Sequence, residues 1–280
     1  MTGEGPGEGQ INAFAYWTQL QQSAAARPAP VDAAAERERW RSLAHDYNRN
    51  ALHVSAPEFV TSIVSLIEPG ASVLEIGPGT GGFTIPAAAR AGRVFAVDMS
   101  DAMLAVLQGE LRRREIGNVT AVQAEWPDVE AGRHDVVLAV NSLYRVVDLR
   151  ACIERMTAAA RRRVVVAWSV GHNPPVLPSV VDPRGPRGYR PGVTYIHLLL
   201  ALHELGIATE VDVRRVQRQV WRASYEDAAE KLIGLPDPTE QERGDADALA
   251  RRLFVPHGDG VVYSYEGQVA VICWPGAGDE

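Results

Sequence analysis

The segment Val73-Leu74-Glu75-Ile76-Gly77-Pro78-Gly79-Thr80-Gly81-Gly82-Phe83-Thr84 decides the fold of this chain. An apolar run that contains one acid leads into a glycine-rich loop, and a helix is expected to follow the loop. Glycine lacks a Cβ atom, so such a loop can turn tightly and bring its backbone close to a ligand. The unpaired N–H groups at the start of a helix favour electronegative ligand groups. The segment therefore predicts a ligand site at a strand–loop–helix junction.

Short apolar runs alternate with helical patterns on the C-terminal side of this segment. The runs cover residues 73–76, 94–97, 119–123, 135–140 and 163–169, and helices are expected over 81–90, 100–113 and 148–160. Strands that alternate with helices indicate a parallel sheet with helices on both faces. Runs that are apolar throughout, such as 136–140, are typical of strands that are buried on both sides.

The composition is that of an ordinary globular protein, with 46% apolar and 22% charged residues in a chain of 280. The formal net charge is -7, whereas general nucleic-acid binders carry a basic face, so duplex DNA and bulk RNA are not expected as partners. Cys152 and Cys273 are the only cysteines, too few for a disulfide framework or a Cys-rich zinc site, and no spacing of His, Cys and acids suggests a metal. The longest apolar runs are far shorter than the ~20 residues of a membrane span, and no signal peptide is recognised. We therefore expect a cytoplasmic protein without a membrane partner.

Asp98 ends the second apolar run, 23 residues after Glu75. That spacing is where one βαβ unit places the acid that binds ribose hydroxyls. With E-x-G-x-G-x-G at 75–81 and this aspartate, the sequence resembles the class I S-adenosylmethionine-dependent methyltransferases, most clearly over residues 40–169. The dinucleotide-binding fingerprint would be G-x-G-x-x-G instead. An acid at position 75 also argues against a pyrophosphate ligand, because it would repel the phosphates.

The resemblance implies that S-adenosylmethionine is the cofactor and that S-adenosylhomocysteine is the product. It assigns Glu75 to the ammonium group of the methionine moiety, directly or through water, and Asp98 to both ribose hydroxyls. It assigns Glu125 to the exocyclic amine of adenine, a role for which Asp128 and Glu130 are alternatives. The other expected cofactor-binding residues are Tyr47 in an N-terminal lid, Gly77, Pro78, Gly79, Thr80 and Gly81 in the loop, Met99 and Met103 beside adenine, Trp126 over the same slot, and Asn141 near the methionine part.

The acceptor pocket of this family forms after the fourth and fifth strands and under the lid. The residues expected there are Tyr144, Arg145, Trp168, His172, Tyr195 and His197, with His45 and His53 as further candidates. A phenol or a neutral amine needs no strong base to accept a methyl group, whereas an alcohol or a carbon acid does. We therefore take His172 and Tyr144 as the candidate catalytic residues, with His172 as the base.

Three functions remain open on the sequence. The first is methylation of a small molecule, which the acidic charge favours; the arginine-rich composition and an inserted segment are typical of a bacterial enzyme of secondary, or specialised, metabolism. The second is methylation of a nucleic-acid adenine amine, because 74–84 is close to the first motif of the rRNA adenine dimethylases and 141–144 is similar to their N-x-P-Y motif, with Leu143 in place of proline. The third is a protein that binds the cofactor without catalysis. The sequence allows a monomer or a homodimer.

By resemblance, we expect a Rossmann-like, doubly wound sheet of seven strands in the order 3-2-1-4-5-7-6, with the last strand antiparallel. Residues 1–35 are expected to be disordered apart from a short helix and a linker, and 36–280 to form one methyltransferase domain. Its expected parts are N-terminal lid helices (36–70), a cofactor-binding core (71–170), a loop–helix insertion before strand six (171–208) and C-terminal strands and helices (209–280). Gly267 is expected to break the last apolar run, 261–274, into a hairpin or a bulge.

Overall fold

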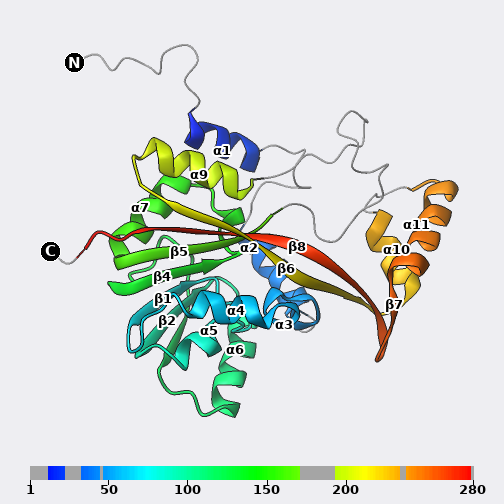
Figure 1. Ribbon diagram of the computed structural model, residues 1–280, viewed down its shortest axis with the longest axis horizontal. Helices are drawn as coiled ribbons and strands as arrows, with labels where there is room; N and C mark the ends of the chain where they lie inside the picture. The colour runs from blue at the N-terminus through cyan, green and yellow to red at the C-terminus, as the bar shows by residue number, and fades with distance from the viewer. Residues whose placement is uncertain (1–11, 23–32, 45–46, 171–192, 234–237, 279–280) are drawn as a thin grey trace.

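The computed structural model describes residues 12–22, 33–44, 47–170, 193–233 and 238–278, and its central feature is one twisted sheet (Figure 1). The strands are β1 (Ser72–Ile76), β2 (Arg93–Asp98), β3 (Val119–Gln123), β4 (His134–Val140), β5 (Ala160–Val170), β6 (Glu210–Arg222), β7 (Val255–His257) and β8 (Gly260–Pro275). Their order is β3-β2-β1-β4-β5-β8-β6, with β1 to β5 parallel and β8 antiparallel to both of its long neighbours. Because β8 occupies the place of the seventh strand, the predicted order and direction are confirmed. The short β7 pairs with β8 and is an addition.

Helices cover both faces of the sheet, as the alternating pattern predicted. One face carries α1 (Ala13–Gln22), α7 (Leu149–Ala159) and α9 (Tyr195–Glu204). The other carries α3 (Leu52–Ser55), α4 (Pro57–Val64), α5 (Thr84–Ala88) and α6 (Asp101–Arg113). The remaining helices are α2 (Ala33–Leu43), η1 (Tyr47–Asn50), η2 (Leu143–Arg145), α10 (Tyr225–Ile233) and α11 (Glu240–Leu253). Within the described ranges, no helix has the length and apolarity that crossing a membrane requires.

The two helical layers explain why the central strands are apolar throughout. Side chains of a strand alternate between its two faces. In β4, Val137 and Ala139 belong to the core under α1 and α7, whereas Val136 and Leu138 belong to the core under α4 and α5. All four are buried. A polar residue in this part of β4 would therefore be desolvated on either face.

Helix α1 packs as part of the core, although it lies in the segment that the sequence assigned to a short helix and a linker. The Trp17 side chain is fully buried, and its indole Nε1 donates to the carbonyl oxygen of Val146 at 2.8 Å. Its ring meets Trp168 of β5 edge-on at 6.2 Å. The helix therefore seals one face of the sheet near the end of β4.

The expectation that Gly267 interrupts the last apolar run is wrong. The pairing of β8 with β6 continues through Gly267, which lies opposite Val216 without a shift of register. The chain turns earlier, between β7 and β8, where Gly258 adopts a φ of +60°. A single glycine does not break a strand whose pairing with its neighbour continues on both sides of it.

Candidate cofactor and acceptor site

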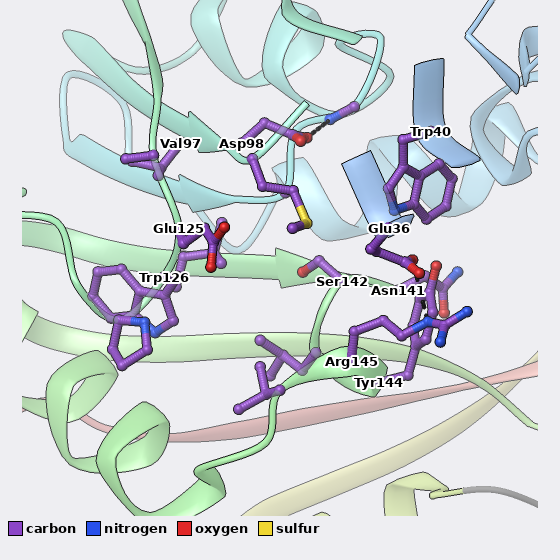
Figure 2. A pocket seen from close by; sticks show the side chains of 18 of the residues that line it. Glu36, Trp40, Val97, Asp98, Glu125, Trp126, Asn141, Ser142, Tyr144 and Arg145 are labelled. Carbon is purple, nitrogen blue, oxygen red and sulfur yellow. Dashed lines mark hydrogen bonds and ion pairs between the residues drawn. The ribbon is translucent and has the colours of Figure 1, made fainter. Parts of the chain in front are cut away.

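A cavity of about 440 Å³ lies at the carboxyl edge of the sheet, where β1, β2 and β4 end (Figure 2). Parallel α/β sheets bind ligands at this edge. Helix α2 and η1 contribute to its wall from the N-terminal part of the chain. The lining includes Glu36, Trp40, Tyr47, Gly77, Gly79, Asp98, Met99, Met103, Glu125, Trp126, Asp128, Asn141, Ser142, Tyr144 and Arg145. Among the described residues, no group of His, Cys, Asp and Glu side chains is arranged to hold a metal ion.

The glycine loop needs its glycines for both conformation and space. Gly77 has a φ of +71°, and a Cβ atom there would lie 2.4 Å from the Cβ of Ser142 in the loop after β4. Gly79 has a φ of +55° and lines the cavity. Gly81, with a φ of +95°, lies instead against Leu107 of α6. The loop thus lines the cavity through Gly77 and Gly79 and packs on the core through Gly81.

Asp98 projects from the end of β2 toward the cavity and is held by backbone groups. Its Oδ2 accepts from the Gly79 N–H at 3.0 Å, and its Oδ1 accepts from the Ser100 N–H at 2.9 Å (Figure 2). Burial raises the pKa of this carboxyl, against the opposing effect of the backbone N–H groups of Ser100, Gly79 and Met99. A partly desolvated carboxylate in a fixed orientation is suited to accept hydrogen bonds from a diol.

Glu75 is buried beneath the loop and does not line the cavity. Its carboxyl is 2% exposed, and Oε2 has no hydrogen-bond partner in the part of the chain that is described. Burial raises the pKa of Glu75 to about 7, and the nearby Asp98 carboxylate contributes to the rise. The Thr84 hydroxyl opposes this rise. A buried carboxyl with an unpartnered oxygen is costly unless it is protonated or a cation approaches.

Replacing Glu75 by Gln should therefore stabilise the protein in a pH-dependent way. The folded state holds the Glu75 proton up to a pH of about 7, whereas a glutamate in the unfolded chain has its ordinary pKa of 4.5. The bound proton thus stabilises the folded state by up to about 3 kcal/mol below pH 4.5. This stabilisation is lost as the pH rises to about 7. We expect Glu75→Gln to be more stable than the wild type at pH 8 and to match it near pH 4.5 in urea unfolding. A difference independent of pH would contradict the protonated carboxyl.

The expected adenine side of the cavity contains Met99, Met103, Glu125 and Trp126, all of which the structure brings to the lining (Figure 2). Glu125 also pairs with Arg37 of α2 through Oε1 at 2.6 Å. Among the described residues, its Oε2 is left to accept from a ligand amine. Asp128, the alternative acid, lines the same cavity, whereas Glu130 does not.

Asn141 ends β4 in a conformation that is uncommon for a residue with a side chain, with a φ of +48°. Its side-chain amide donates to Ser169 Oγ at 3.0 Å and accepts from the Ser169 N–H at 2.7 Å. The amide therefore ties the ends of β4 and β5 together. Asn141 therefore lines the cavity at the point where the backbone turns sharply after β4.

Tyr47, the expected lid residue, lines the cavity near the glycine loop. Its ring lies 3.8 Å from where a Cβ atom on Gly79 would be, and Trp40 of α2 meets it edge-on at 6.0 Å. Thr80 is buried behind the loop, where its hydroxyl donates to Asn48 Oδ1 at 2.6 Å. Thr80 thus anchors η1 to the loop, and like Pro78 it does not line the cavity.

Tyr144 and Arg145 line the cavity where it meets helix α2 (Figure 2). Burial raises the pKa of the Tyr144 phenol to about 12. Arg145 Nε lies 3.1 Å from Oε1 of Glu36, which is buried in α2. At neutral pH this part of the wall therefore presents a protonated phenol and a paired guanidinium.

Three predicted acceptor residues do not reach the cavity. Trp168 is 6% exposed and packs against Trp17 in the core. His197 Nδ1 accepts from the Thr194 N–H at 2.9 Å and caps α9, and Tyr195 begins that helix and packs on the same core. We therefore reassign Trp168, His197 and Tyr195 from the acceptor pocket to structural roles. His172 and His45 lie outside the described residues, and His53 packs over Gly82.

Glu36, Trp40 and Ser142 line the cavity without having been predicted. The sequence offered one signal, the helical spacing of Trp40 with Leu43 and Tyr47, which indicates only an apolar face. Glu36 lies in a run of charged residues that is typical of a solvated helix. Its burial depends on Arg145, which is distant in the sequence.

Known proteins are similar to this chain chiefly over the strands that carry the cavity. A family model described as a methyltransferase domain matches residues 73–163. An uncharacterized protein of Haemophilus influenzae is 30% identical over 192 residues, covering 66% of this chain and 70% of that protein. The YcgJ protein of Bacillus subtilis has a similar fold, with a TM-score of 0.52 and 12% identity over 79% of this chain and 98% of that one.

Two further relatives differ in what they methylate. A "Probable cobalt-precorrin-6B C(15)-methyltransferase (decarboxylating)" of Methanothermobacter thermautotrophicus is 33% identical over 31% of this chain and 46% of its own length. A "Probable ribosomal RNA small subunit methyltransferase A" of Pyrobaculum aerophilum is 31% identical over 31% of this chain and 38% of its own length. The likeness to both is confined to less than half of their lengths. With the family model, the sheet order and the glycine loop in agreement, the chain belongs to the class I S-adenosylmethionine-dependent methyltransferases, and S-adenosylmethionine is its cofactor.

Proposed function

We propose that the protein methylates an oxygen, nitrogen or carbon atom of a small-molecule acceptor and that it serves specialised metabolism. The observation that carries this proposal is the closure of the cavity by α2. Three ion pairs join this helix to the core: Arg37–Glu125 at 2.6 Å, Arg41–Asp101 at 3.0 Å and Arg145–Glu36 at 3.1 Å. A helix held across the cofactor cavity favours a metabolite as the acceptor, because a polymer would have to displace the helix.

The residues at the cavity fit the cofactor. Asp98 can accept from the ribose hydroxyls, and the buried oxygen of Glu75, which lies beneath the loop, can interact with the ammonium group through water. Met99, Met103 and Trp126 supply an apolar slot, and Glu125 can accept from the adenine amine. When bound, the cofactor supplies a methyl group that its sulfonium already activates.

The chain then has to position the acceptor and exclude water. Tyr144 carries its proton at neutral pH, since burial raises the pKa of its phenol to about 12. It can therefore donate a hydrogen bond to the acceptor but is a poor base. Arg145, paired with Glu36, helps to hold the lid over the cavity. His172 stays the proposed base for an acceptor that needs one.

An adenine amine of RNA is the second candidate acceptor. The Asn141-Ser142-Leu143-Tyr144 sequence and the similarity to the Pyrobaculum relative favour it. The net charge of -7 and the closed cavity weigh against it, because enzymes that flip bases need affinity for the phosphate backbone and a stacking platform.

Calorimetric titration with S-adenosylhomocysteine, with NAD as the control ligand, tests the cofactor site. We expect micromolar binding of S-adenosylhomocysteine and none of NAD. Binding of NAD would contradict the assignment of the glycine loop.

With binding established, transfer of an isotopically labelled methyl group is measured on metabolite fractions and on total RNA. Label on RNA that is lost with rising salt would favour the second candidate, and binding without transfer to either would indicate a cofactor-binding protein.

A further inference from the structure

Strands β6 and β8 form a two-stranded ribbon that continues past the carboxyl end of β5. The last pair between β5 and β8 is Val170 with Gln268, whereas β6 and β8 stay paired as far as Arg222 and Val261 (Figure 1). The ribbon therefore projects beyond the sheet edge at which the cofactor cavity lies. One of its faces is covered by α4 near Val216 and by α10 and α11 near Val220. Arg218 lies on that face, between the two coverings.

Arg218 and Tyr265 are a cross-strand pair with unused hydrogen-bonding groups. Directly opposite residues of an antiparallel pair lie on one face with their Cβ atoms about 5 Å apart. The Nε and Nη1 atoms of Arg218 are buried and make no hydrogen bond, and the same is true of the Tyr265 hydroxyl. In the described part of the chain, no carboxylate forms an ion pair with Arg218. Two guanidinium nitrogens and a hydroxyl on one face of the ribbon, at directly opposite positions, thus lack an acceptor.

The other arginines of β6 have partners. Arg214 pairs with Asp212 at 2.7 Å and donates to Ser62, and Arg215 pairs with Glu266 at 3.4 Å. Arg222 donates to the carbonyl oxygen of Trp221 at 2.9 Å. A buried charge that lacks a partner destabilises the fold and calls for an explanation, such as a ligand that supplies the missing group. The Nε of Arg222 is also buried without a partner, but Arg218 alone among the arginines of β6 has two such nitrogens, Nε and Nη1.

Arg218 also lies near η1, the segment whose Tyr47 lines the cofactor cavity. The pKa of the Tyr47 phenol is raised by burial and by Asp98 and lowered by the Arg218 guanidinium. The η1 segment that carries Tyr47 is held against the ribbon, because the Trp221 N–H donates to Asn50 Oδ1 at 2.7 Å. A molecule that reaches Arg218 would thus lie next to the lid residue that closes over the cofactor.

We propose that Arg218 and Tyr265 bind an oxyanion of the acceptor, a carboxylate or a phosphate, and that the acceptor is therefore an anionic small molecule. Arginine binds both kinds of oxyanion with charge-assisted hydrogen bonds, and the Tyr265 hydroxyl can donate one more. This inference rests on the proposed methylation of a small molecule and names the class of that molecule.

The Nε–Hε resonances of ¹⁵N-labelled full-length protein test the site directly. The Arg218 signal is assigned by its loss in Arg218→Gln, and the protein, saturated with S-adenosylhomocysteine, is titrated with benzoate, inorganic phosphate and the neutral isostere benzamide. We expect the Arg218 signal to shift saturably with benzoate or phosphate and not with benzamide. Which of the two anions binds more tightly distinguishes a carboxylate from a phosphate acceptor.

Two variants complete the test. In Arg218→Gln, the dissociation constant of the tighter anion should rise at least about tenfold, whereas Arg215→Gln, on the other face of the same strand, should leave it unchanged. Without ligand, Arg218→Met should melt no lower than the wild type, because it removes an unpaired buried charge. An Arg218 signal unmoved by both anions, or moved equally by benzamide, would overturn the proposal. Failure of S-adenosylhomocysteine to bind would contradict the cofactor site instead, and the anion titration of the unliganded protein would still be decisive.

Discussion

Asp98→Ala should bind S-adenosylhomocysteine about 100-fold more weakly than the wild type, or worse. The proposed role of Asp98 is to accept from both ribose hydroxyls, and each hydrogen bond to a charged group contributes about 1.5–3 kcal/mol. Losing two such bonds corresponds to at least a factor of about 100 in affinity. The carboxylate is already oriented by the N–H groups of Gly79 and Ser100, so little ordering is needed when the ligand binds.

The measurement is the calorimetric titration, repeated on three variants whose unfolding is monitored in parallel. Asp98→Asn keeps the size of the side chain and one acceptor oxygen, so its affinity should fall between those of the wild type and Asp98→Ala. Glu110→Ala removes a partly exposed acid, paired with Arg113, farther along the same strand–helix unit and should leave the affinity unchanged. Wild-type affinity in a folded Asp98→Ala protein would refute the ribose assignment.

Trp17→Ala should lower the free energy of unfolding by about 3–5 kcal/mol, the usual cost of removing a large buried aromatic side chain. Trp17 is fully buried between α1 and β5, where it contacts Trp168 and donates to the carbonyl oxygen of Val146. Truncation would leave a cavity under α1, and the Val146 carbonyl oxygen would keep only the hydrogen bond from Gln21 Nε2. Because Val146 follows Tyr144 and Arg145 in the cavity wall, we also expect weaker binding of the cofactor.

Denaturant unfolding followed by circular dichroism checks this result. The adjacent Tyr16 is 44% exposed, and Tyr16→Ala should cost less than about 1 kcal/mol. A Trp17→Ala protein as stable as the Tyr16→Ala protein would mean that α1 is a detachable segment, as the sequence alone suggested.

The sheet and the cofactor side of the cavity could be predicted because their signals are local. Runs that are apolar at every position, such as 136–140, indicate strands that are buried on both faces, and β4 has both faces covered. The loop from Gly77 to Gly81 requires left-handed backbone angles, which glycine adopts most readily, and the structure has them. Asp98 was placed by the length of one strand–helix–strand unit. These features depend on residues within a few tens of positions of one another.

The acceptor side could not be predicted in the same way, because distant segments decide which side chains reach the cavity. Trp168 and His197 have residue types that suit an acceptor pocket, yet α1 covers the first and the start of α9 uses the second as a cap. Conversely, Glu36 lies in a charged run typical of a solvated helix, and its burial depends on Arg145. The periodicity of a sequence shows which face of a helix or strand is apolar, but it does not show which other helix or strand will cover that face.

The sequence by itself therefore determined the fold class, which follows from the alternation of apolar runs and helical patterns. The order of the strands and the cofactor followed from its resemblance to a known family, which rests on the glycine and acidic residues along one stretch of chain. Only the tertiary structure decided how the cavity is closed and which charges lack partners. The sequence marks Glu75 as part of the glycine motif and shows Arg218 only as one arginine among several, and in both cases burial by other segments removes water from the charged group. Because the cost of a buried charge depends on everything that packs around it, that information exists only once the chain has folded.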